Sequence, residues 1–145
     1  MRPIKTLDAQ SFAKYGLVIE RRDSSPIPPE GTSQFDLLAS VESSGWRVGY
    51  ITCRARTFRQ MEYHHATQHT FEPTRGVAAL VVAQKDEPEN FEVFLLDRPV
   101  IIRQEVWHAV VAISDLAEIK FMGDLSSSAQ NYTFDQPHRI AMVPA

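Results

Sequence analysis

Runs of alternating and continuous apolar residues predict that most of the chain is built from short β-strands. Residues 46–56 alternate imperfectly and place Val48, Tyr50 and Thr52 on one side, followed by two arginines. Residues 76–83 form an uninterrupted apolar run, which is typical of a strand that is covered on both faces. We expect the remaining strands at residues 91–96, 100–102, 106–113, 117–122 and 139–143.

The first part of the chain is less regular. Asp8 is placed to cap a short helix that reaches Tyr15, and Gly16 is placed to end it in the left-handed conformation. Residues 17–19 then fit a first strand. Residues 21–34 carry prolines and small polar residues that resist both helix and central strand, so we expect a surface loop there. Such a loop could cover the mouth of a barrel or be only a tolerated excursion.

Many short strands and one helix predict an all-β fold, an antiparallel barrel or jelly roll with a short N-terminal helix. The length of 145 residues predicts one domain, residues 1–145, which is large enough to bury a proper core. Hydrophobic residues make up 43% of the chain and charged residues 23%, so the composition is that of an ordinary soluble globular protein.

The charge and the cysteine count narrow the possible partners. A net charge of −3 leaves no basic surplus to hold a phosphate backbone, so we expect no nucleic-acid binding. No apolar stretch follows the N-terminal residues, so we expect neither a signal peptide nor a membrane span, and the cytoplasm is the expected location. Cys53 is the single cysteine, which fits a reducing compartment, and we expect its side chain to be packed.

Candidate chemistry gathers in residues 62–76. If this segment is extended, Glu62 and His64 share one face of it. His69, after a short polar turn, and His108, from another strand, could complete a set of three imidazoles and one carboxylate. That set suits zinc, nickel, manganese or ferrous iron. Any one of these residues alone would more often be structural, but four at this spacing favour a functional site.

Two roles in this set stay open. Glu62 could be a metal ligand or the general base of a reaction. His69 could be a metal ligand, could orient another ligand, or could contact the substrate directly. His65 should point away from the site if the segment is extended, and we expect it to be solvent-facing or packed.

The spacing resembles the first metal-binding motif of the cupins, small β-barrels that bind one metal through two histidines and a glutamate. The matching pattern is Glu62-x-His64, four residues, His69, six residues and Gly76, and His108 takes the place of the histidine in the second cupin motif. The resemblance implies a cupin-type barrel, that is, a double-stranded β-helix that binds a metal.

The match to the cupins departs from the family pattern in the order of its ligands. Glu62 stands at the position where the family has its first histidine, and His69 stands at the position of the family's glutamate. The family's Pro-x-Gly before the second-motif histidine is absent, and Arg103 and Glu105 stand in its place.

A narrower resemblance covers most of the chain. In order along the sequence, several segments are similar to the ureidoglycolate lyases: residues 11–20, residues 35–41, Arg54-Ala55, Glu62-x-His64, Phe71-x-Pro73, the strand after Gly76 and residues 106–108. These are cupin-fold enzymes that split ureidoglycolate into glyoxylate and urea at the end of purine and allantoin degradation. His69 is a departure, because the family more often carries glutamine there.

A small anionic substrate needs a local basic cluster. Arg54 and Arg56 are candidates to hold a carboxylate, because a guanidinium offers two parallel donors, and Arg54 matches an arginine of the family. A strand that ends in these arginines suits one that runs toward the open end of a barrel. Arg103 and Lys120 are alternatives, and Asn131 could donate an amide hydrogen bond to a urea carbonyl.

The resemblance implies a lyase that acts on ureidoglycolate with a bound divalent metal. Two alternatives remain: another metal-dependent cupin enzyme, such as an iron-dependent dioxygenase or an isomerase, and a non-catalytic barrel that binds a small metabolite. Because cupins often pair through edge strands, we also expect a homodimer.

Overall fold

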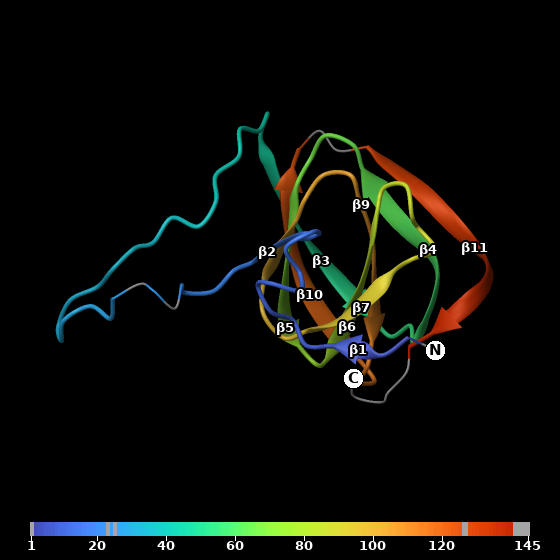
Figure 1. The fold of residues 1–145 in the computed structure, drawn as a ribbon, viewed down its shortest axis with the longest axis horizontal. Helices are drawn as coiled ribbons and strands as arrows, with labels where there is room; N and C mark the ends of the chain where they lie inside the picture. Colours follow the sequence, from blue (N-terminus) through green and yellow to red (C-terminus); the bar gives the residue numbers. More distant parts are fainter. Residues whose placement is uncertain (1, 23, 25, 126–127, 141–145) are drawn as a thin grey trace.

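The structure, a computed structural model, describes residues 2–22, 24, 26–125 and 128–140. These residues form two β-sheets that face each other and close a barrel (Figure 1). The six-stranded sheet has the order β1 (Ile4–Lys5), β7 (Glu92–Leu96), β6 (Ala78–Gln84), β9 (Val106–Ala112), β4 (Thr57–His64) and β11 (Ala129–Arg139). The five-stranded sheet has the order β2 (Gly16–Val18), β8 (Val100–Ile102), β5 (His69–Arg75), β10 (Ala117–Asp124) and β3 (Trp46–Cys53).

Neighbouring strands in both sheets pair antiparallel, apart from β1 and β7, which are parallel. Strand β6 lies inside the six-stranded sheet and is buried on both faces. Leu80 and Val82 pack between the two sheets, whereas Ala79 and Val81 pack in a second cluster on the other face. The all-β barrel and the doubly covered strand predicted from the sequence are both confirmed.

Strand β3 presents its even-numbered residues to the outside. Ile51 and Cys53 contact the core between the sheets, and Arg47 lines a hollow in the barrel interior. Val48 and Tyr50, which the alternation grouped together, are 53% and 58% exposed. Cys53 is a free, buried cysteine, as the sequence predicted.

The described residues contain no α-helix, so the prediction of a short helix from Asp8 to Tyr15 is wrong. Asp8 does cap the segment, because its Oδ1 accepts a hydrogen bond of 2.9 Å from the backbone N–H of Ser11. Phe12 and Gly16 each donate to the carbonyl four residues earlier, but the chain between them forms separate turns. So short a segment gains few hydrogen bonds against the cost of nucleating a helix. The described chain also lacks a helix long and apolar enough to cross a membrane.

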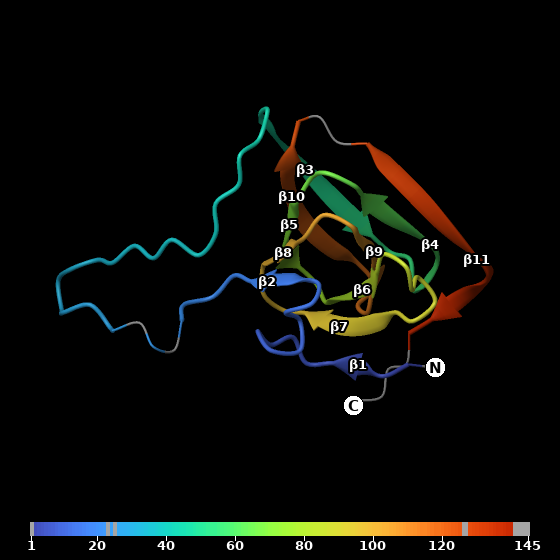
Figure 2. The same ribbon diagram turned by 45° about the horizontal axis from the view of Figure 1, so that its top comes forward.

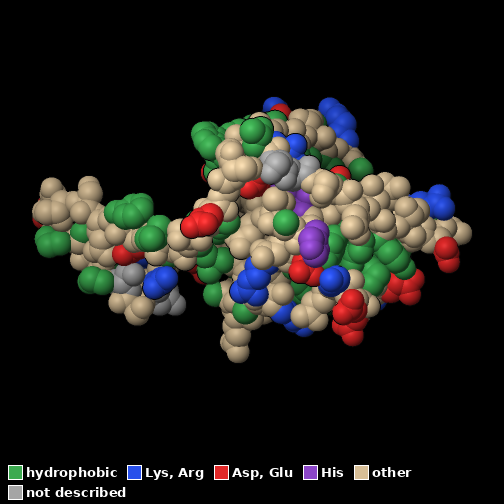
Figure 3. All heavy atoms as spheres, turned by 90° about the horizontal axis from the view of Figure 1, so that it is seen from above, with side chains coloured by type: hydrophobic (Ala, Val, Ile, Leu, Met, Phe, Trp, Pro, Cys, Tyr) green, Lys and Arg blue, Asp and Glu red, His purple; other side chains and the backbone are tan. Residues whose placement is uncertain are grey.

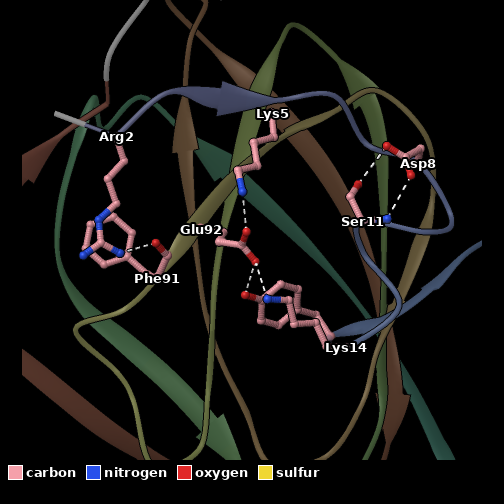
Figure 4. Close-up of polar contacts among 8 residues, drawn as sticks. Arg2, Lys5, Asp8, Ser11, Lys14, Phe91 and Glu92 are labelled. Carbon is pink, nitrogen blue, oxygen red and sulfur yellow. Dashed lines mark hydrogen bonds and ion pairs between the residues drawn. The ribbon is translucent and has the colours of Figure 1, made fainter. Parts of the chain in front are cut away.

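Glu92 on β7 anchors this N-terminal segment to the barrel. Its carboxylate accepts hydrogen bonds from Lys5 and Tyr15, and the Nζ of Lys14 lies 3.5 Å from its Oε2 (Figure 4). Nearby, the guanidinium of Arg2 donates to the carbonyl of Phe91. These contacts hold β1 against β7 without a helix.

The last strand lies earlier in the chain than the sequence suggested. Strand β11 pairs with β4 at the edge of the six-stranded sheet, with a register shift between Thr133 and His138. We expected a strand at residues 139–143, of which 141–143 lie outside the described residues. Strand β11 is polar and contains Pro137, which an edge strand tolerates, so it lacks the apolar pattern of a buried strand.

Residues 19–45, called the arm below, join β2 to β3, and the described part of them holds neither helix nor strand. Figures 1 and 2 show the arm projecting away from the barrel beside the five-stranded sheet. The arm is fixed at both ends, because Ile19 N–H donates to Pro99 and Ser44 Oγ donates to Asp124 Oδ1, at 2.8 and 2.9 Å. A surface loop was expected here; in this structure it does not lie over the barrel mouth.

Candidate active site

Two neighbouring strands bring an acidic side chain and two imidazoles to one point. Glu62 and His64 lie on β4, and Glu62 pairs directly with His108 on β9. One ligand atom from each of these three residues lies within 4.8 Å of the others. Glu62 and His64 point the same way, since Oε2 and Nε2 are 3.8 Å apart, as two residues spaced by two on a strand must. His65, just beyond the strand, is exposed.

The two imidazoles are buried and keep nitrogen atoms available. The rings of His64 and His108 stack with centroids 5.4 Å apart, and each residue is 6% exposed. The Nδ1 of His108 lies 3.1 Å from the carbonyl of Val106, which can only accept, so Nδ1 carries the proton and Nε2 keeps its lone pair. The Nδ1 of His64 is buried without a hydrogen-bond partner among the described residues. This donor set fits a divalent metal ion.

His69 adjoins the cluster but stands outside the compact group. It is the first residue of β5, its ring lies 4.0 Å from that of His64 and 6.5 Å from that of His108, and it is 2% exposed. The ring also contacts Phe121 with centroids 4.8 Å apart. Of the four residues predicted from the sequence, the structure gathers Glu62, His64 and His108 and places His69 as a neighbour of His64.

Burial keeps all three histidines neutral. It lowers the pKa of His108 to about 4, although the hydrogen bond to Val106 opposes the change. Burial, followed by the nearby His64 and His108, lowers the pKa of His69 to about 3. Burial also lowers the pKa of His64, against the attraction of Glu62. Because a metal binds only the neutral imidazole, these shifts keep the ligands ready near neutral pH.

The cluster opens into a hollow of about 370 Å³ between the two sheets. Arg47 from β3, Glu62 from β4 and Asn131 from β11 line it, together with the aromatic rings of Phe71 and Phe121. Asn131 pairs with Glu62 across the strands, so the structure brings this predicted residue to the site. In the view from above, histidine side chains are visible near the middle of the molecule, with acidic and basic side chains close to them (Figure 3).

Arg54 and Arg56 lie at the other end of the barrel. Cys53 pairs with Ala117 at one end of β10, whereas Arg47 pairs with Gly123 at the other end. Six residues of strand span roughly 20 Å. Arg56 is engaged there by Asp115 at 2.7 Å. The structure therefore does not bring these two arginines to the histidines, because β3 runs away from the site rather than toward it.

Arg47 is the basic residue that the sequence analysis missed. It follows Trp46 at the start of β3 and shares the inward face with Ile51 and Cys53. Its guanidinium carbon lies 5.5 Å from the ring centroid of Phe121, and its charge contributes to lowering the pKa of His69. Ile51 and Cys53 lie on the same face of β3 as Arg47, but Val48 and Tyr50 form an equally apolar row on the other face, so the sequence offered no signal that selects the inward face.

Comparisons with known proteins give one family over nearly the whole chain. The family described as Ureidoglycolate lyase matches residues 2–140. A curated protein named Ureidoglycolate lyase 2, from Rhizobium meliloti (strain 1021), is 27% identical over 157 residues, which cover 95% of this chain and 96% of that protein.

Two solved structures are similar to the chain at 17% identity. A dTDP sugar isomerase from Desulfovibrio desulfuricans G20 has a TM-score of 0.49 and matches 78% of this chain and 77% of its own. A cupin 2 domain-containing protein from Halorhodospira halophila has a TM-score of 0.45 and matches 88% of this chain and 83% of its own.

Proposed function

The chain belongs to the ureidoglycolate lyase family, and from this premise we propose that it cleaves ureidoglycolate into glyoxylate and urea in allantoin degradation, with a divalent metal at Glu62, His64 and His108. One observation carries the proposal. In a chain of this family, the fold brings a carboxylate and two buried neutral imidazoles within 4.8 Å of one another, beside a hollow lined by an arginine and an amide. The family and the named relative make the chain a lyase.

The ion would be held by His64, His108 and one oxygen of Glu62. A divalent ion bound there supplies Lewis-acid chemistry, which lowers the pKa of a hydroxyl group as it does for water. Zinc, nickel, manganese and ferrous iron all suit imidazole and carboxylate ligands. His69, which stands outside the compact group, packs against His64 and limits where its ring can turn.

Arg47 and Asn131 would orient the substrate. Ureidoglycolate carries a carboxylate, a hydroxyl and a ureido nitrogen on one carbon. The guanidinium of Arg47 offers two parallel donors to the carboxylate. The amide of Asn131, one strand from Glu62, offers a donor to the ureido carbonyl. Both side chains line the same hollow as the histidines, so one small molecule can meet them together.

Glu62 would move the proton. Its side chain is 57% exposed toward the hollow, and a carboxylate has two oxygens, so one remains to accept the hydroxyl proton. As that proton leaves, the carbonyl of glyoxylate forms and the carbon–nitrogen bond breaks. Glu62 then returns the proton to the departing nitrogen, and urea leaves. His69 does not take this role, because a group with a pKa of about 3 holds a proton poorly near neutral pH.

The test is to incubate the purified protein with ureidoglycolate and to measure glyoxylate and urea. We expect equal amounts of both products, loss of the activity in chelator, and recovery on adding a divalent metal. We expect Arg47→Ala to lower kcat/KM roughly 10- to 100-fold, since a hydrogen bond to a charged group contributes about 1.5–3 kcal/mol. Arg54→Ala, at the opposite end of β3, is the matched control and should retain full activity. No glyoxylate with any added metal would rule out the proposed reaction.

A further inference from the structure

The hollow beside the candidate ligands is longer than ureidoglycolate. It follows β4 from His64 and Glu62 at one end to Gln60 and Arg59 at the other. A strand rises about 3.3 Å per residue, so the Cα atoms of His64 and Arg59 lie roughly 16 Å apart. Ureidoglycolate spans only about 6 Å, since five bonds of about 1.3–1.5 Å join its outermost atoms. A volume of about 370 Å³ is within the range of pockets that hold larger ligands.

The part of the hollow beyond the ligands has apolar walls. Strand β9 runs antiparallel to β4, with His108 opposite Glu62, so Val110 lies further toward the Gln60 end. Ile51 of β3 and Val110 both line the hollow there. The amide of Gln60 donates to the hydroxyl of Thr133 at 3.2 Å, which leaves its oxygen to accept from an N–H of a ligand. A substrate could therefore continue past the reacting carbon along β4.

Arg59 places a positive charge at the far end of the hollow. Its Nε donates to the carbonyl of Phe134 at 3.0 Å, and its Nη2 donates to the carbonyl of Asp135 at 3.3 Å. Both carbonyls belong to the part of β11 where the register against β4 shifts, and Figure 2 shows β11 beside β4. No carboxylate of the described residues forms an ion pair with Arg59. Its guanidinium is thus held in place and carries a charge that an anionic group could balance.

We propose that the preferred substrates of this site are ureidoglycolates that carry a carboxylate-bearing substituent on the distal nitrogen, and that Arg59 binds this second carboxylate. The inference rests on the proposed function, because it keeps the reacting carbon at the metal ligands and the ureido carbonyl at Asn131. The distal nitrogen then points along β4 past Gln60. A guanidinium that two carbonyls already orient loses little freedom when it binds a carboxylate.

The reaction stays the same for the longer substrate. The hydroxyl proton passes to Glu62, the carbonyl of glyoxylate forms as the carbon–nitrogen bond breaks, and Glu62 returns the proton to the departing nitrogen. The products are glyoxylate and a urea that keeps the carboxylate-bearing substituent. The step consumes no further reactant.

Binding of an inert analogue tests the second carboxylate. Carbonyldiglycine, a urea with a carboxymethyl group on each nitrogen, lacks the hydroxyl group and cannot release glyoxylate. We expect it to bind the zinc-loaded protein at least about 10-fold more tightly than its monoamide, in which one carboxylate is a neutral amide, as measured by isothermal titration calorimetry. Equal affinity for the two compounds would overturn the proposal, as would binding of neither.

A variant tests whether Arg59 provides this preference. Arg59→Gln should reduce the preference to less than about 2-fold by weakening the diacid alone, because only the diacid meets the guanidinium. Arg54→Gln is the control, since Arg54 does not line the hollow, and it should keep the preference. Far-ultraviolet circular dichroism should show the same β-barrel in all three proteins. A preference that survives in Arg59→Gln, or an equal loss for both compounds, would show that Arg59 does not bind the ligand.

Turnover separates this inference from the proposed reaction. We expect kcat/KM for ureidoglycolate with a carboxymethyl group on its distal nitrogen to exceed that for ureidoglycolate by about 10-fold or more, mainly through a lower KM. A lower kcat/KM for the longer compound would contradict the inference and leave the proposed reaction standing. Absence of glyoxylate from both compounds would count against the reaction, whereas the binding preference is measured without turnover.

Discussion

Glu105 links the two strands that carry the candidate ligands. It has a φ of +64°, a left-handed conformation that suits glycine, and it occupies the position where the second cupin motif has glycine. Its backbone N–H donates to the carbonyl of His64 at 2.8 Å. Its carboxylate accepts from the Tyr63 hydroxyl at 3.0 Å and pairs with Lys85 at 2.9 Å. Side-chain contacts thus replace the conformational freedom of glycine three residues before His108.

Substitution at Glu105 should reveal the backbone strain. Glu105→Ala and Glu105→Gly both lose the contacts with Tyr63 and Lys85, but only alanine keeps the strained conformation. We expect the alanine variant to melt roughly 2–4 °C below the glycine variant, the reverse of the usual order of these residues. Thermal unfolding of the metal-free proteins measures it. An alanine variant that is as stable as the glycine variant would show that the conformation carries no strain.

For single residues, the sequence predicted the candidate metal ligands better than the candidate substrate contacts. The two-residue spacing of Glu62 and His64 requires a shared face on any strand, so this pair could be found without coordinates. His108 was proposed as an imidazole from another strand, and its place in the second cupin motif supported that choice. Arg47 was missed because β3 has large apolar residues on its outward face, and the choice of face for such a strand depends on which neighbours cover it.

The ring of His69 on β5 lies against Gly123 on the neighbouring strand β10 and leaves no room for a side chain there unless the ring moves. A Cβ added to Gly123 would lie 2.1 Å from Cδ2 of His69, its cross-strand partner. We expect Gly123→Ala to displace the His69 ring and, through it, the neighbouring His64, with a loss of at least about tenfold in kcat/KM and roughly 1–3 kcal/mol of stability. Steady-state kinetics and chemical unfolding check both effects.

A glycine on the next strand supplies the control for this substitution. A Cβ at Gly49 would lie 3.6 Å from the ring of Phe121, an ordinary contact, so Gly49→Ala should keep its activity. Full activity in Gly123→Ala would mean that the position of His69 does not matter for the site.

Among the elements, the continuously apolar strand β6 was found from the sequence, whereas the polar strand β11 was not. The run at β6 is apolar on both faces because both faces are covered. Strand β11 pairs at an edge and has a polar outer side, so its composition resembles that of a turn. The predicted N-terminal helix was wrong because tertiary contacts hold that segment as turns. Phe12 and Tyr15 contact Phe94, and Lys5 contacts Glu92.

For the whole molecule, the neutral histidines predict how stability depends on pH. His69 and His108 have folded pKa values of about 3 and about 4, below the ordinary value of 6.5 in an unfolded chain. Between these limits the unfolded chain binds more protons, so the free energy of unfolding of the metal-free protein should fall as the pH falls from about 6.5 to about 4. Each histidine contributes at most about 1.4 kcal/mol per pH unit.

Chemical unfolding at a series of pH values measures this slope. His69→Gln should make the slope shallower over this range, because one buried neutral imidazole is removed. His65→Gln is the control, since His65 is exposed, and it should leave the slope unchanged. A slope that is the same in His69→Gln as in the unaltered chain would contradict the burial of a neutral His69.

The measurement that tests the central claim most directly is elemental analysis of the protein after incubation with a divalent metal and dialysis. The account predicts one bound ion per chain, lost in His64→Ala and in His108→Ala and retained in His65→Ala. An unaltered protein that holds no ion, or a His108→Ala variant that holds as much metal as the unaltered protein, would contradict it.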